Sequence, residues 1–275
     1  MRSSRNTNAK SELLQSLQER FSQASNQQQE RVSEVRIENC IGFSKVPLGI
    51  AGPLRVGYLS VHGRHLRTAR HTLSNGMSRD PVFVFANPGH AAAFAKTLPT
   101  MQSSFARWAE ETSKHVKLQL FKPTLIGSRV HIFCSYDCGS AAGQNMVTKA
   151  TQYACDMLRK LFADEYQVRD FFIEGQLASD EKPSWGNVMN ARGVEVFAWG
   201  KITPAACQYV LGCTTERLYR AQQTLKEGGI RNGQFGSNIN TSNVIAAIFI
   251  STGQDPASTA EGSWSHLTSE LDSET

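Results

Sequence analysis

The sequence predicts an α+β fold in which a small sandwich of strands and helices is inserted into a larger chain. Two segments alternate in the manner of strands, Lys117–Phe121 and Val130–Ser135, and Pro81–Phe85 reads as a strand before them. Helical segments fall between and after these strands: one opened by Pro88, one over Phe105–Lys114 and a long one over residues 143–162. Interleaved strands and helices favour layers of helix packed on a sheet.

The remaining elements follow the inserted unit. Gly193–Lys201 reads as a strand. Thr203 and Pro204 suit the N-cap and first position of a helix that we expect to run toward Leu225. A last apolar helix is expected over Ser242–Ser251, followed by a polar tail that we expect to fray.

Composition excludes several classes of protein. Hydrophobic residues make up 40% of the chain and charged residues 19%, so most of it should fold. The run Val244–Ile250 is too short to cross a bilayer, and residues 1–14 lack the apolar core of a secretory signal, so we expect a cytoplasmic protein without a membrane segment. The six cysteines form no CxxC pair and have no histidine partners at zinc-ligand spacing, so we expect reduced thiols and no metal.

The net charge of +5 comes partly from a basic stretch over residues 55–79. Such a stretch could hold nucleic acid, or equally the phosphates of a nucleotide cofactor. No nucleic-acid motif and no interleaved aromatic residues accompany it, so we expect no nucleic acid partner.

The turn before the long helix carries a possible phosphate site. Gly139 and Gly143 would let the backbone approach a ligand closely, and the helix start offers free N–H groups. A helix packed close to a strand also requires glycines, and on the turn alone this structural interpretation is favoured. The buried stripe of the helix is predicted to be Met146, Ala150, Tyr153, Ala154, Met157 and Leu161.

Four segments in order resemble the 3-hydroxy-3-methylglutaryl-CoA (HMG-CoA) reductase family. ENCIGFSKVPLGIAGPL is similar to a family segment at the dimer contact and substrate pocket, and NGMSRDPVF resembles the DGM[ST]R motif, which makes Arg79 its substrate arginine. CGSAAGQNMVTKA resembles the family's NADPH-side loop. GSNINTSNVIAAIFISTGQD resembles the helix that ends in a catalytic aspartate, here Asp255, with Asn243 on the substrate side. The resemblance covers about residues 38–265.

The resemblance implies a domain arrangement. A large substrate-binding domain, incomplete at both ends, would comprise residues 38–79 and 171–265, and a small ferredoxin-like NADPH-binding domain would comprise residues 80–170. Residues 1–37 would form a flexible segment with a short helix, and residues 266–275 a frayed tail.

The family's reaction is the NADPH-dependent reduction of HMG-CoA to mevalonate, which supplies isoprenoid precursors. The resemblance implies Asp255 and Lys182 as catalytic residues and Arg79, Asn243 and Asp180 as substrate contacts. The implied cofactor contacts are Gly139, Ser140, Gly143, Gln144 and Asn145.

The sequence departs from the family at its reacting groups. In DEKPSWGNV, Glu181 stands where the family has the lysine that stabilises oxygen during hydride transfer. The family's glutamate segment does not occur between Leu54 and Gly76, and its late histidine belongs to a portion beyond this sequence. Ser140 replaces an aspartate of the cofactor loop. We therefore expect low or absent reductase activity.

Three alternatives stay open at this point. The chain could be an active reductase, a catalytically inactive relative, or a gene fragment without an independent role. An inactive relative could bind CoA or NADPH, form a homo-oligomer, or pair with a full-length reductase. Structural roles also remain open for several residues: Arg79 could pair with an acid such as Asp80, and Asp180 and Lys182 could form a solvated loop pair.

Overall fold

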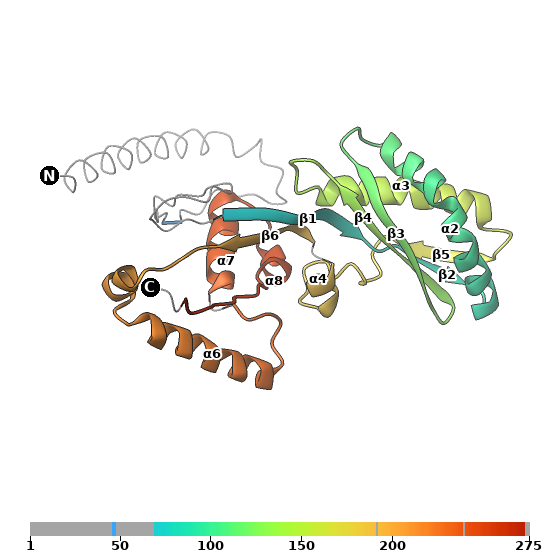
Figure 1. Ribbon diagram of the computed structural model, residues 1–275. Coiled ribbons are helices and arrows are strands. Elements are labelled where there is room, and N and C mark those ends of the chain that lie inside the picture. The colour runs from blue at the N-terminus through green and yellow to red at the C-terminus, as the bar shows by residue number, and fades with distance from the viewer. Residues whose placement is uncertain (1–45, 48–68, 191, 239, 273–275) are drawn as a thin grey trace. The chain divides into compact units, whose positions relative to one another are not determined.

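The computed structural model describes residues 46–47, 69–190, 192–238 and 240–272 of the 275-residue chain. All elements below belong to one compact unit, residues 51–275. The predictions for residues 1–37, and for 38–54 apart from Val46 and Pro47, lie outside the described residues. The mixture of helices and sheet confirms the predicted α+β class (Figure 1).

A six-stranded sheet organises the described part of the chain, and each strand pair in it is antiparallel. The strands are β1 (Ala69–Arg79), β2 (Val82–Phe85), β3 (Lys117–Ile126), β4 (Arg129–Asp137), β5 (Val168–Phe172) and β6 (Gly193–Trp199). Their order is β5-β2-β4-β1-β6, with β3 also pairing with β4. β1 pairs with β6 up to Gly76 and with β4 from Met77 onward. The strand end at Arg79 is therefore held inside the sheet.

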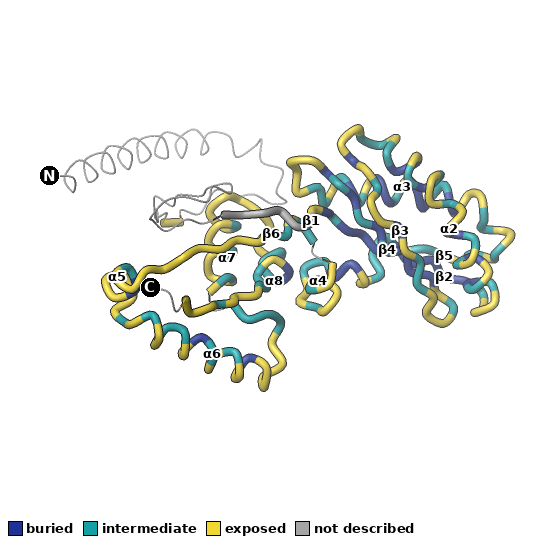
Figure 2. The backbone as a smooth tube through the Cα atoms, in the orientation of Figure 1, coloured by how far each residue is buried: buried dark blue, intermediate teal, exposed yellow. Residues whose placement is uncertain are grey.

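Two long helices, α2 (Pro88–Glu111) and α3 (Gln144–Phe162), pack on one face of this sheet. Phe94 of α2 contacts the rings of Phe83 and Phe85, and Thr151 of α3 hydrogen-bonds the buried Tyr136 hydroxyl at 2.9 Å. Figure 2 shows how the buried residues gather here, whereas β6 and α6 (Thr215–Asn232) are mostly exposed. The main hydrophobic core thus lies between strands β2, β3 and β4 and helices α2 and α3.

The prediction of two helices over residues 88–114 was wrong, because α2 is continuous through Pro99. Asn87 caps its start by accepting a hydrogen bond from the His90 N–H at 3.0 Å. Proline interrupts the helix ladder, but Pro99 is exposed while Phe94, Leu98 and Phe105 continue one buried stripe across it. Packing of that stripe outweighs the local cost of the proline.

The helix predicted from Thr203 toward Leu225 is interrupted. Thr203 does cap a helix, but α5 (Pro204–Ala206) passes into one π-helical turn, η2 (Cys207–Leu211). Gly212 follows with φ of 66°, a left-handed conformation that suits glycine, and Thr214 caps the new helix α6. The sequence LGCTT is therefore a helix stop followed by a helix start.

At the start of α3, the backbone of Gly143 lies close to the side chain of Cys138. Its φ is 84°, and a Cβ there would meet the side chain of Cys138, the Cβ atom at 2.6 Å. Gly139 also has positive φ, 62°, but a Cβ there would meet nothing within 4 Å. An alanine at Gly139 would therefore meet only conformational strain, whereas an alanine at Gly143 would meet both strain and a steric clash.

We expect Gly143→Ala to destabilise the protein more than Gly139→Ala. The Gly139 variant should cost about 1–2 kcal/mol, the penalty of a left-handed conformation. The Gly143 variant should cost about 1–3 kcal/mol more, because the methyl group overpacks against Cys138. Urea unfolding followed by circular dichroism measures both. Equal losses of unfolding free energy in the two variants would show that Cys138 moves to accommodate the added methyl group at no cost.

The C-terminal elements are α7 (Thr241–Thr252), the single turn η3 (Pro256–Ser258) and α8 (Thr259–Gly262), and a short helix α4 (Trp185–Met189) precedes β6. The tail is not free at Leu267: its N–H donates to the Ser237 hydroxyl at 3.0 Å, and its carbonyl accepts from Gln222 at 3.2 Å. These bonds hold the segment after α8 beside α6.

Candidate active site

The loop between β5 and α4, residues 173–184, is anchored at the end of β1. Asp80, which is fully buried, accepts the Gly175 N–H with its backbone carbonyl at 2.5 Å and the Leu177 N–H with its carboxylate at 2.9 Å. The same carboxylate contacts His131 Nδ1 at 2.9 Å. A Cβ on Gly175 would lie 2.6 Å from His131 Nδ1, so the close approach requires glycine.

The same loop carries backbone strain. Gln176, Ser179 and Glu181 have φ of 78°, 53° and 58°, the left-handed region that non-glycine residues rarely adopt. The buried Asn187 holds the strained segment, since its side chain donates to the Lys182 carbonyl at 2.8 Å. Strain of this kind concentrates at functional sites.

Arg79 lies at the centre of a cluster of charged side chains. Its guanidinium pairs with Asp180 at 2.5 Å and Glu174 at 3.3 Å, and its Nε donates to Thr148 Oγ1 at 2.7 Å. Only 9% of the Arg79 side chain is exposed. Arg79 therefore does pair with acids, as the structural alternative expected, but these are Asp180 and Glu174 rather than Asp80, which faces His131 and the loop. Burial raises the pKa of Glu174 despite its bond to Arg79.

Asp180 is bound from several elements. Besides Arg79, it accepts the side-chain amide of Gln144 at 3.3 Å and pairs with Arg192 at 2.5 Å. Arg192 in turn pairs with Glu261 of α8 at 2.5 Å, and Glu261 also accepts the backbone N–H of Glu181 at 2.7 Å. A chain of buried charges therefore joins β1, the loop and α8. Asp180 is not the solvated loop residue that the sequence left open.

Glu181 and Asp255 form a pair of carboxyl groups. The Glu181 side chain lies close enough to Asp255, the N-cap residue of η3, for the two carboxyl groups to interact. Burial, this interaction and the negative charges of Asp255, Asp180 and Glu261 raise the pKa of Glu181. The neighbouring Lys182 donates its Nζ to the Asp180 carbonyl at 2.9 Å. Among the described contacts, none brings the Lys182 ammonium group to Asp255.

We expect Glu181→Gln to stabilise the protein at neutral pH. A carboxyl whose pKa is raised on folding contributes stability below its unfolded pKa, about 4.3, and loses that contribution as pH rises through its folded pKa. The glutamine variant lacks this loss. Its free energy of unfolding should therefore match that of the wild type near pH 4 and exceed it increasingly toward pH 7.

Thermal unfolding from pH 4 to pH 7 measures this difference. Glu227→Gln, on the exposed face of α6, is the control and should show no such trend. An advantage for Glu181→Gln that is constant with pH would mean that the carboxyl pair does not form.

The predicted cofactor turn is exposed at Ser140, whereas Gly143 forms the N-cap of α3 without any side-chain capping bond. Gly139 donates its N–H to Asp137 at 2.8 Å, which fixes the turn. Gln144 points to Asp180, and Asn145 is exposed. The start of α3 thus offers N–H groups of the kind that bind phosphate oxygens, next to the charged cluster.

Asn243 is not brought into this cluster by any contact between described residues. It lies on α7 and donates its side-chain amide to Asn240 at 2.5 Å. Thr148, Arg192 and Glu261 are site residues that sequence reasoning missed. Each is a single polar residue without a motif of its own, and no sequence signal marked them.

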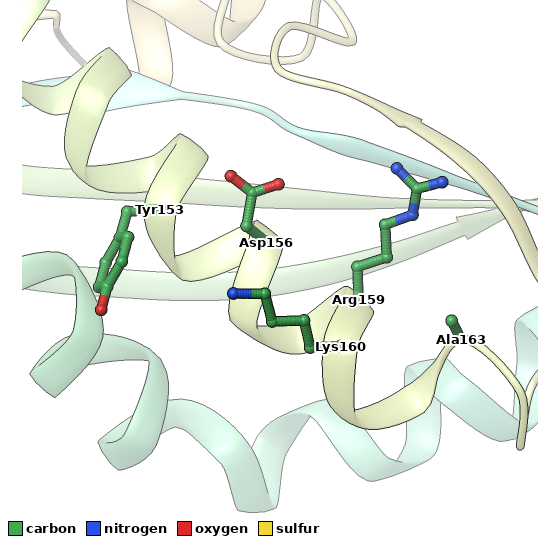
Figure 3. A pocket seen from close by; sticks show the side chains of 5 residues that line it. All are labelled: Tyr153, Asp156, Arg159, Lys160 and Ala163. Atoms are coloured by element: carbon green, nitrogen blue, oxygen red, sulfur yellow. The ribbon is translucent and has the colours of Figure 1, made fainter.

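A hollow elsewhere on α3 is lined by Tyr153, Asp156, Arg159, Lys160 and Ala163 (Figure 3). It shares no lining residue with the charged cluster. Within the described ranges, no three His, Cys, Asp or Glu side chains are arranged to hold a metal ion, and no helix is long and apolar enough to cross a membrane.

Comparison with known proteins decides the family. The family model for hydroxymethylglutaryl-coenzyme A reductase matches residues 67–274, which is most of the chain. The chain belongs to the HMG-CoA reductase family. This confirms the resemblance found in the sequence motifs.

Curated members of the family agree with this assignment. The chain is 31% identical over 267 residues to the 3-hydroxy-3-methylglutaryl-coenzyme A reductase of Haloferax volcanii, covering 87% of this chain and 65% of that protein. It is 30% identical to the reductase of Methanothermobacter thermautotrophicus, covering 85% of this chain and 65% of that one. The chain thus spans slightly less than two thirds of the length of these relatives.

The fold agrees as well. The structure is similar to the 3-hydroxy-3-methylglutaryl-coenzyme A reductase of Streptococcus pneumoniae, with a TM-score of 0.61 over 90% of this chain and 72% of that chain at 15% identity.

Proposed function

We propose that this chain is an HMG-CoA reductase family protein that keeps ligand contacts but reduces HMG-CoA with NADPH very slowly or not at all. The observation that carries the proposal is the position of the Glu181 carboxyl group beside the carboxyl group of Asp255. In the resemblance, Glu181 takes the place of the lysine that stabilises the substrate oxygen. A carboxylate repels the negative charge that develops there.

The charge around Asp255 supports the same proposal. Asp180 and Glu261 add negative charge near Glu181, and their cationic partners, Arg79 and Arg192, are each paired with two carboxylates. Removing a single oxyanion donor costs about 10²–10³ in turnover. Lys182, whose ammonium group is bound by the Asp180 carbonyl, does not offset this loss in our proposal.

We also propose the substrate and cofactor contacts that the family resemblance implies. HMG-CoA would meet Arg79, Asp180 and Asn243. NADPH would lie against Gly139, Ser140, Gly143, Gln144 and Asn145, where the uncapped start of α3 suits a phosphate. When bound, NADPH would supply the hydride. Gln144 would link the two sites, since it belongs to the cofactor turn and donates to Asp180.

We extend the proposal to the domains. The order β2-α2-β3-β4-α3-β5 is a β-α-β-β-α-β order, which supports a ferredoxin-like cofactor domain over residues 80–170. Residues 38–79 and 171–265 would form the partial substrate domain. We propose a cytoplasmic protein that forms a homo-oligomer or pairs with a full-length reductase.

Calorimetric titration of purified protein with HMG-CoA tests the retained contacts. We expect saturable binding to the wild type, at least tenfold weaker binding to Arg79→Met, and unchanged binding to Arg169→Met, whose arginine is exposed on β5. Circular dichroism checks that each variant is folded. Folded wild-type protein that binds no HMG-CoA would refute the proposal.

A further inference from the structure

Two cysteine thiols face each other outside the charged cluster. Cys207 Sγ and Cys213 Sγ lie 3.9 Å apart, and both cysteines are free. Cys207 is fully buried, whereas Cys213 is partly exposed. The two residues are six positions apart and belong to the segment between β6 and α6, near the label α5 in Figure 2.

The local backbone explains why they meet. Cys207 begins the π-helical turn η2, and the Gly212 N–H donates to the Gln208 carbonyl at 3.2 Å, which closes the turn. The left-handed Gly212 then reverses the chain, so that Cys213 returns toward Cys207 before Thr214 caps α6. Single π-helical turns are frequent at functional positions.

The two sulfur atoms are close to bonding distance, but they do not form a disulfide. Bonded sulfurs lie about 2.05 Å apart, so these two need to approach by about 2 Å. Residues 208–212 between them are exposed, and a Cβ on Gly212 would meet nothing within 4 Å. The short turn can therefore adjust without displacing a packed neighbour.

The other described cysteines do not share this environment. Cys134, Cys138 and Cys155 lie in the core between the sheet and the helices, and burial raises the pKa of each thiol. A buried thiol that keeps its proton reacts slowly. Burial and the neighbouring Cys213 raise the pKa of Cys207 as well. Reaction with a dissolved oxidant should therefore begin at the partly exposed Cys213.

We propose that Cys207 and Cys213 form a reversible redox site that small disulfide molecules oxidise to an intramolecular disulfide. The Cys213 thiolate attacks one sulfur of the small disulfide, forms a mixed disulfide and releases one thiolate. The Cys207 thiolate then attacks the Cys213 sulfur and releases the second thiolate. Two cysteine thiols lose two electrons, the small disulfide gains them, and the two protons end on the released thiols.

One tryptic peptide reports the outcome. Cleavage after Lys201 and Arg217 gives the peptide of residues 202–217, which contains both cysteines and no others. The folded wild type is treated with glutathione disulfide, then unfolded and alkylated in acid-quenched denaturant so that every remaining thiol reacts, digested and examined by mass spectrometry. We expect this peptide to lose two hydrogens and to resist alkylation, and we expect dithiothreitol to restore two alkylation sites.

Two variants separate the roles of the thiols. Cys207→Ser lacks the second thiol, so it should accumulate glutathione on Cys213. Cys213→Ser should stay unmodified, because Cys207 is buried. Wild-type peptide that is fully alkylated after treatment, or that retains glutathione, would overturn the proposal. Circular dichroism of the oxidised protein, recorded before alkylation, shows that the chain is folded when the thiols react.

Discussion

Replacing Glu181 by lysine is expected to raise NADPH-dependent reduction of HMG-CoA by about 10²-fold over the wild-type chain. The substitution puts a cation beside Asp255, where the wild type has a second carboxyl group. The size of the effect follows from the cost of losing one group that stabilises a developing oxyanion, about 10²–10³ in turnover. Lysine also removes the repulsion that, together with the larger effect of burial, raises the pKa of Glu181, so the variant should not be less stable.

The matched control is Glu227→Lys, which makes the same charge change on the exposed face of α6. Its turnover should equal that of the wild type, because long-range effects of exposed charge are screened. If folded Glu181→Lys is no faster than Glu227→Lys, the carboxyl at position 181 is not what limits the reaction.

Replacing Arg192 by methionine is expected to destabilise the protein by about 3–5 kcal/mol, the cost of removing one partner from a buried ion pair. The Arg192 side chain is 1% exposed and pairs with both Asp180 and Glu261. Methionine fills similar space but leaves two carboxylates close together. The loop that carries Glu181 would also lose its support through Glu261.

Urea unfolding at neutral pH measures the loss, and Lys201→Met is the control. Lys201 pairs with Asp272 at 2.7 Å, but both side chains are more than half exposed. Exposed pairs contribute about 0–1 kcal/mol. A loss for Arg192→Met no larger than the loss for Lys201→Met would show that the charged cluster does not support the fold.

Local patterns predicted much of the fold. Sequence patterns located β2, β3 and β4, the last two by their alternation, and capping signals located the starts of α2 and α5, because these features act over a few residues. The continuity of α2 through Pro99 was missed, since it depends on contacts made by Phe94 and Phe105 in the folded core. Strand β5 lacks a strong alternating pattern and was also missed.

The stripe predicted for α3 shows the same limit. Ala150 and Ala154 are buried as expected, but Tyr153 and Leu161 are 40% and 55% exposed. Val147, Thr151 and Leu158 are buried in their place. Hydrophobicity ranks tyrosine and leucine above threonine, whereas the position of α2 and the hydroxyl of Tyr136 decide which side of α3 faces the core.

The candidate site, like the fold, could be predicted only in part from the sequence. Motifs placed Arg79, Asp180 and Glu181 in one neighbourhood, because their spacing resembles that of the family. No motif revealed that Arg192 and Glu261 complete the cluster, since both reach it through the fold from positions distant in sequence. The contact of Glu181 with Asp255 likewise depends on how η3 meets the loop.

The most direct test of the account is the oxidation of NADPH by the purified wild-type chain in the presence of HMG-CoA, beside a complete reductase at equal concentration. We predict turnover at least about 10²-fold below that of the complete enzyme, from protein that circular dichroism shows to be folded. Turnover within tenfold of the complete enzyme would contradict the account, because a carboxyl pair at Glu181 and Asp255 would then support the reaction.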